Sequence, residues 1–167
     1  MTRSFNLTVV MAALAALPLA VLAHGPDDRA KAPKAAISPD EHRFGVEGDP
    51  KKANRTILIS MDDRMHYSKS EILVKQDETV TFVISNKGRL THELVIGTDD
   101  ELKQHAALMR KNPDMEHDEP FMTHVKPGTS ESMTWRFTKP GTFLYGCLVA
   151  GHFEAGMKGR IVVAVNK

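Results

Sequence analysis

Short runs in which hydrophobic and polar residues alternate follow one another along the chain from residue 55 onward. Alternation with a period of two is typical of strands that bury one face, and Gly, Pro and Asn between the runs indicate turns. We predict seven strands, at residues 56–59, 71–74, 79–84, 92–96, 130–138, 142–147 and 160–165. Seven short strands separated by turns predict an all-β fold, an antiparallel sandwich of about 110 residues.

One predicted helix is inserted between the strands, from Thr98 to Asn112. Thr98 and Glu101 form a capping box at its start, and Asn112 followed by Pro113 ends it. The helical spacing i, i+3, i+4, i+7 places four residues on one face: Leu102, His105, Ala106 and Met109. This face is expected to point inward.

The first 23 residues have the features of a secretory signal peptide. Arg3 precedes an apolar run over residues 7–22, and Val21, Leu22 and Ala23 end the run at the positions that a signal peptidase reads. A membrane anchor is the alternative, but the run is short for a membrane span and a polar, Pro-containing stretch follows it. We therefore predict cleavage after Ala23 and a periplasmic mature protein with no membrane attachment.

Residues 24–54 are rich in Ala, Pro, Asp, Lys and Gly and show little hydrophobic periodicity. This composition is typical of flexible segments, so we predict a flexible N-terminal arm with a short ordered piece around Phe44. The expected organisation is a signal peptide at residues 1–23, the arm at 24–54 and one folded domain at 55–167, which we expect to be monomeric.

Composition narrows the range of functions. Hydrophobic and charged fractions of 41% and 26% are ordinary for a globular protein, and a net charge of +1 removes the electrostatic case for a nucleic-acid partner. The single cysteine excludes an internal disulfide framework. A free thiol outside the cytoplasm is open to oxidation, so we expect something to occupy it.

The strongest chemical signal lies between the last two predicted strands. Cys147, His152 and Met157 are separated by four residues each, so one short loop can direct a thiolate, an imidazole and a thioether at one point. His92, at the start of its predicted strand, is the candidate for a further equatorial ligand. Two imidazoles and a thiolate with a weak axial methionine form a type-1 copper site. The alternative is that Cys147 and Met157 are ordinary core residues.

Residues 55–165 resemble a cupredoxin, and the four-and-four ligand spacing is similar to that of rusticyanin and the auracyanins rather than plastocyanin. The chain also resembles exported cupredoxin-like proteins associated with bacterial copper tolerance. The segments that carry this resemblance are residues 86–88, 92–95, 112–117 and 156–159. It implies a Greek-key β-sandwich, one type-1 copper, the ligands His92, Cys147, His152 and Met157, and a periplasmic role in copper handling or electron transfer.

A second group of soft donors surrounds the end of the predicted helix. Methionine and histidine together suit copper, so we expect an auxiliary copper site. Its candidate residues are His105, Met109, Met115, His117, Met122 and His124. The alternative is that the helix residues pack inward and the loop histidines are solvated. Two weaker candidates are the group Met61, Met65 and His66, and His24 at the mature N-terminus.

The enzymatic alternatives find little support in the sequence. Cys147 is flanked by Gly146 and Leu148, so the histidine bridge of multicopper oxidases is absent, and no His-x-His pair is present. Hydrolase motifs are absent as well. An enzymatic role would be limited to oxidation of Cu(I) at the auxiliary site with type-1 copper as electron acceptor.

The function we expect is copper tolerance through binding and redox cycling of copper in the periplasm. The alternative is a soluble electron shuttle of a respiratory or photosynthetic chain. Either function requires a redox partner protein. We expect that partner to dock on an apolar patch around His152, formed by Leu148, Val149, Ala150, Phe153 and Ala155.

Overall fold

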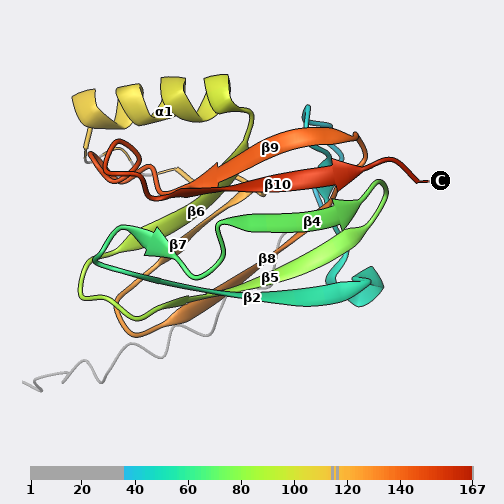
Figure 1. Ribbon diagram of the computed structural model, residues 1–167, viewed down its shortest axis with the longest axis horizontal. Helices are drawn as coiled ribbons and strands as arrows, with labels where there is room; N and C mark the ends of the chain where they lie inside the picture. The colour runs from blue at the N-terminus through green and yellow to red at the C-terminus, as the bar shows by residue number, and fades with distance from the viewer. Residues whose placement is uncertain (1–35, 114, 116, 167) are drawn as a thin grey trace, which may run out of the picture. The chain divides into compact units, whose positions relative to one another are not determined.

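Two five-stranded sheets face each other in the computed structural model, which describes residues 36–113, 115 and 117–166 (Figure 1). The first sheet has the order β1-β8-β5-β2-β3 and the second has the order β4-β10-β9-β6-β7. The strands of the first sheet are β1 Val46–Glu47, β2 Arg55–Asp62, β3 His66–Tyr67, β5 Thr79–Asn86 and β8 Ser130–Arg136. Those of the second are β4 Glu71–Lys75, β6 His92–Gly97, β7 Met122–Val125, β9 Gly141–Gly146 and β10 Lys158–Ala164.

All seven predicted strands are present, and the expected β-sandwich with one inserted helix is confirmed. The prediction of a wholly antiparallel sandwich is wrong, because β2 pairs with β5 and β4 pairs with β10 in parallel. Neither pair is joined by a hairpin: the chain passes to the other sheet between the two strands. Parallel neighbours require such a crossover connection, which the local hydrophobic pattern cannot reveal.

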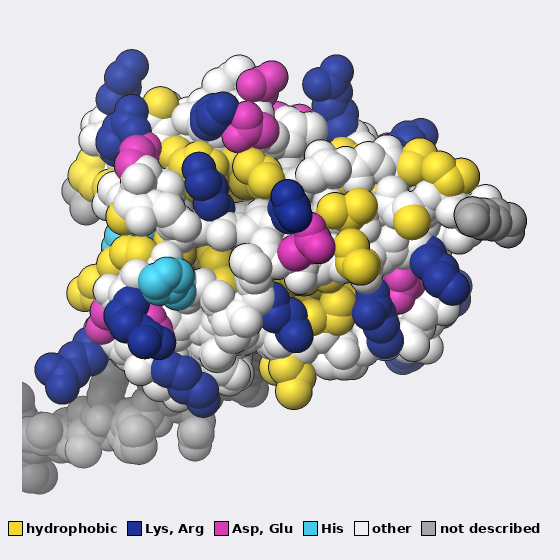
Figure 2. Space-filling view, viewed as in Figure 1, with side chains coloured by type: hydrophobic (Ala, Val, Ile, Leu, Met, Phe, Trp, Pro, Cys, Tyr) yellow, Lys and Arg dark blue, Asp and Glu magenta, His cyan; other side chains and the backbone are white. Residues whose placement is uncertain are grey.

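The main core fills the space between the two sheets. Along β2 and β5 every second side chain points inward, as the alternating sequence requires. The first sheet contributes Ile57, Ile59, Val80, Phe82, Ile84, Met133 and Trp135, and the second contributes Ile72, Val74, Leu94, Ile96, Phe143, Tyr145, Ile161 and Val163. On the outer face shown in Figure 2, basic side chains are spread widely with acidic ones between them, in keeping with the small net charge.

Helix α1, Asp99–Lys111, begins and ends as predicted. Thr98 accepts a hydrogen bond from the Glu101 amide, the Glu101 side chain accepts from the Thr98 amide, and Asn112 is the C-cap. The buried face of α1 packs against a second hydrophobic cluster beside β6 and β9. This cluster contains Leu102, Ala106 and Met109 of the helix together with Val95, Met122, Leu148 and Phe153. The described residues contain no helix of the length and apolar character needed to cross a bilayer.

The folded unit begins earlier in the sequence than the expected boundary at Arg55. It extends from Ala36, and β1 pairs with β8. Phe44 is 2% exposed within the main core, and its carbonyl accepts a hydrogen bond of 3.1 Å from the Trp135 indole. The ordered piece expected around Phe44 is therefore an integral part of the sandwich. The predicted signal peptide and residues 24–35 of the predicted arm lie outside the described residues.

Replacing Phe44 with Ala should lower the free energy of unfolding by about 3–5 kcal/mol, because a large aromatic side chain leaves a cavity in the core. Urea unfolding of the metal-free protein measures this change. Ile37→Ala is the matched control, since Ile37 lies in the same N-terminal segment and is 45% exposed. Equal stability of Phe44→Ala and Ile37→Ala would contradict the assignment of this segment to the fold.

Candidate metal centre

The pairing of β6 with β9 places the first two predicted ligands at one end of the second sheet. The two strands are antiparallel, with Val95 opposite Gly146, so the start of β6 lies beside the end of β9. His92 is the first residue of β6, and Cys147 directly follows β9. The Glu93 amide, one residue after His92, donates to the Cys147 Sγ atom at 3.3 Å.

The loop after Cys147 folds back on itself through its own backbone. The Cys147 amide donates to the Met157 carbonyl at 3.1 Å, and the Met157 amide donates to the His152 carbonyl at 3.0 Å. Gly151 and Gly156 have φ angles of 87° and 97°, in the left-handed region that favours glycine. These two turns return the chain to β10.

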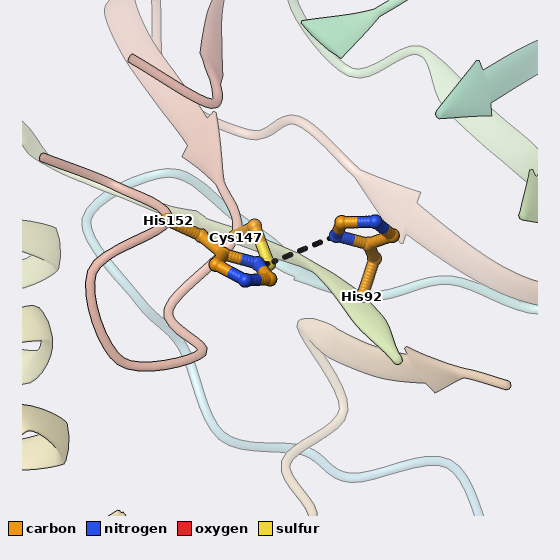
Figure 3. Close-up of side chains that lie close together, drawn as sticks. All are labelled: His92, Cys147 and His152. Atoms are coloured by element: carbon orange, nitrogen blue, oxygen red, sulfur yellow. Dashed lines mark hydrogen bonds between the residues drawn. The ribbon is translucent and has the colours of Figure 1, made fainter. Parts of the chain in front are cut away.

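The side chains of Cys147, His92 and His152 converge (Figure 3). The Cys147 Sγ atom lies 3.2 Å from His152 Nδ1 and 4.0 Å from His92 Nδ1, and all three donor atoms are within 4.8 Å of one another. Cys147 and His92 are fully buried, whereas His152 is partly exposed. Met157, the fourth predicted ligand, is fully buried in the same hydrophobic core as Cys147.

Asp63 orients the His92 ring. Its Oδ1 atom lies 3.0 Å from His92 Nε2, so Nε2 carries the proton and Nδ1 keeps its lone pair toward Cys147. Asp63 also accepts hydrogen bonds from the amides of Arg89 and Leu90. These bonds lower the pKa of its carboxyl, and the bond from Arg89 has the largest effect. The sequence analysis missed Asp63. It is 29 residues from His92 and no local pattern connects the two.

The electrostatics of the three converging side chains fit a soft metal ion. Burial raises the pKa of the Cys147 thiol to about 12, which favours the neutral thiol, whereas a bound cation favours the thiolate. The pKa of His152 is lowered mainly by burial and to a smaller extent by the nearby His92, and this favours the neutral ring. One thiolate and two imidazoles suit copper, because a thiolate favours Cu(I) and imidazole accepts both oxidation states.

A buried carboxylate, Glu93, links the metal centre to His124. Glu93 is 4% exposed, and its Oε1 atom lies 3.0 Å from His124 Nδ1 while Oε2 accepts from the Leu148 amide at 3.3 Å. His124 Nε2 also donates to the His117 carbonyl at 3.0 Å. The hydrogen bond to Glu93 raises the pKa of His124 to about 9, so His124 is charged at neutral pH.

The structure does not bring the six auxiliary candidates together. His124 has both ring nitrogens engaged and is protonated, so it offers no lone pair to a metal. Met109 is buried in the cluster under α1, as the packing alternative expected for the helix residues, and Met122 of β7 is buried in the same cluster. The three remaining candidates line one pocket: His105, Met115 and His117.

The weaker candidates have different outcomes. Met61 is buried in the main core, Met65 packs against it and His66 is exposed, so these three residues do not form a cluster of donors. His24 lies outside the described residues.

The apolar patch expected around His152 is smaller than predicted. Leu148 and Phe153 are buried because they pack against the apolar face of α1.

Asp63→Ala should weaken copper binding by roughly 10- to 100-fold, because the His92 ring loses the bond that fixes its tautomer and orientation. Competition against a chromogenic copper chelator measures the change in affinity. Asp62→Ala is the matched control, since the neighbouring Asp62 carboxylate pairs with Arg64 instead. Unchanged affinity in Asp63→Ala would show that Asp63 does not position His92.

The Glu93–His124 pair should make stability dependent on pH. A histidine in an unfolded chain has a pKa near 6.5, whereas His124 in the fold has a pKa of about 9. The pair therefore contributes its full stabilisation below about pH 6.5 and loses it as the pH rises through 9. Urea unfolding across this range, compared with His124→Gln, isolates the contribution. Parallel pH profiles of the two proteins would contradict this prediction.

Comparisons with known proteins agree with the geometry. Residues 54–164 match the family described as copper binding proteins, plastocyanin/azurin family. The copper-resistant cuproprotein CopI of Rubrivivax gelatinosus is 48% identical over 120 residues, which cover 72% of this chain and 73% of the relative. CopI of Vibrio cholerae is 32% identical over 114 residues, 68% of each chain.

A solved structure has the same fold. The dithionite-reduced auracyanin of Roseiflexus castenholzii superposes with a TM-score of 0.58 at 28% sequence identity, covering 67% of this chain and 98% of the auracyanin. The cupredoxin-type sandwich expected from the resemblance is therefore confirmed, and so is copper as the cofactor. The chain belongs to the plastocyanin/azurin family of copper-binding proteins.

Proposed function

We propose that this protein acts in copper tolerance in the periplasm by binding and redox cycling of copper at a type-1 centre. His92, Cys147 and His152 would hold the copper ion, and the Met157 thioether would be a further, weaker ligand. The observation that carries the proposal is the convergence of one thiol sulfur and two imidazole Nδ1 atoms within 4.8 Å, at the end of a buried sheet. A copper ion held there supplies one-electron transfer.

The protein contributes rigidity and restricted access to this centre. His92 is held by Asp63, the Cys147 Sγ atom accepts from the Glu93 amide, and the loop closes through Met157. These contacts keep the ligands in one arrangement for both oxidation states. His152 is the ligand with partial exposure, so electrons enter at its ring edge. The redox partner docks there, over Val149, Ala150 and Ala155.

Copper tolerance is favoured by the relatives. The two proteins described above at 48% and 32% identity are both named copper-resistant cuproproteins. The features of residues 1–23 support export to the periplasm and a mature protein free of the membrane. An electron shuttle is the second candidate, and it is favoured by the auracyanin likeness and by the partial exposure of His152.

The decisive test is growth of a deletion strain in excess copper, complemented with the wild-type protein or with Cys147→Ser. Wild type should restore growth and Cys147→Ser should not, because the thiolate is lost. Immunoblots of periplasmic extracts control for the amount of each protein. In the purified variant the intense thiolate-to-copper absorption should disappear while the circular dichroism of the sandwich stays unchanged. Normal copper tolerance of the deletion strain together with impaired respiration would instead favour the shuttle.

A further inference from the structure

A pocket of about 400 Å³ opens between α1 and the segment that follows it. Three soft or borderline metal donors line it: His105 from the helix, and Met115 and His117 from the segment before β7. The carboxyl groups of Glu101 and Glu119 also line it, and that of Glu101 is already bonded to Thr98. The pocket is separate from the type-1 ligands, none of which lines it. Nothing in the proposed type-1 centre requires these three side chains.

The His117 ring is the observation that needs an explanation. Both ring nitrogens are shielded from solvent, and neither has a hydrogen-bond partner among the described residues. A buried polar group without a partner costs about 1–3 kcal/mol, so such a group signals a bound ion or another function. The backbone at His117 is held in place, because its carbonyl accepts from the charged His124 ring.

His105 faces His117 in an arrangement suited to sharing an ion. The two ring centroids are 4.6 Å apart and the rings are tilted by 45°. Burial, followed by the neighbouring His117, lowers the pKa of His105 and favours its neutral form. A neutral imidazole is the form that binds metals. Met115 is partly buried, packs against the cluster under α1 and lines the same pocket as the two rings.

We propose that His105, Met115 and His117 form a second copper site that binds Cu(I). Two imidazoles and a thioether favour Cu(I) over hard divalent ions, which prefer carboxylate and carbonyl oxygens. Since this donor set contains no thiolate, the site adds no intense visible colour. The choice of copper as the ion rests on the proposed function, whereas the assignment of the three donors rests on the pocket and the unpartnered ring.

Hydrogen bonds connect this pocket to the type-1 centre. The His117 carbonyl bonds to His124, His124 bonds to Glu93, and the Glu93 amide bonds to the Cys147 sulfur. The segment that carries Met115 and His117 is thereby anchored to the strand that carries His92. The two copper sites therefore occupy defined places in one rigid framework.

The test is an anaerobic Cu(I) titration of the full-length mature protein in competition with a chromogenic Cu(I) chelator. Wild type should bind one more equivalent than the double variant His105→Ala/His117→Ala. Circular dichroism and the thiolate-to-copper band of the Cu(II)-loaded protein should be the same in both. His66→Ala is the control for the loss of a histidine, because His66 is exposed and distant in sequence from the pocket.

Two matched methionine variants keep the test decisive if the double variant folds poorly. Met115→Leu should weaken the second Cu(I) by roughly tenfold or more, since a soft ligand is lost without a change in volume. Met122→Leu should leave this affinity unchanged, because Met122 is buried in the cluster under α1. Equal affinities in Met115→Leu, Met122→Leu and wild type would overturn the role of Met115.

Proton NMR of the fully reduced protein provides an independent measurement, because Cu(I) is diamagnetic. The last equivalent of Cu(I) should shift the ring protons of His105 and His117 and the methyl signal of Met115. Unmoved signals together with equal stoichiometry in wild type and the double variant would overturn the proposal. If the thiolate band is absent but the His105 and His117 signals still shift, the type-1 assignment fails and the second site stands.

Discussion

The antiparallel pairing of β6 with β9 is the contact on which the metal centre depends. It places the end of β9 opposite Val95, near the start of β6, and so brings the Cys147 sulfur within 4.0 Å of His92 Nδ1 across 55 positions of sequence. The β9-to-β10 loop then needs only to fold back on itself to add His152 and Met157. Because the main core packs behind both strands, the proposed ligands are attached to a scaffold that resists rearrangement.

Buried polar groups around the centre are satisfied by specific partners rather than by solvent. Asp63 binds the far nitrogen of His92, and Glu93 is neutralised by the protonated His124 while it also accepts from the Leu148 amide. An unpaired carboxylate at the position of Glu93 would be costly at 4% exposure. The Glu93–His124 pair therefore stabilises the surroundings of the copper site and at the same time removes His124 from metal binding.

Helix α1 has two roles in the arrangement. Its buried face covers Leu148 and Phe153, and this packing holds the loop in place just after Cys147 and just after His152. This packing also limits the exposed apolar surface around His152 to smaller side chains. On the neighbouring part of its surface the helix presents His105 to His117, which creates the pocket for which we propose Cu(I).

Although the short strands β1, β3 and β7 were not predicted, local patterns in the sequence were sufficient for seven of the ten described strands, the helix with its capping box, and the loop with the proposed ligands. Each of these depends on residues that are close together in the chain: alternation within a strand, Thr98 with Glu101, and Cys147, His152 and Met157 at equal spacing. The chemistry of that last group, in a chain with a single cysteine, by itself indicates copper.

Only the tertiary structure decided which distant residues meet. The parallel strand pairs, the insertion of Phe44 into the core and the bond from Asp63 to His92 all join positions with no shared local pattern. The same holds for the auxiliary histidines and methionines, whose composition alone could not separate donors from core residues. Burial and hydrogen-bond partners made that distinction. A side chain can bind a metal only when its lone pair is accessible and is not already used in a hydrogen bond.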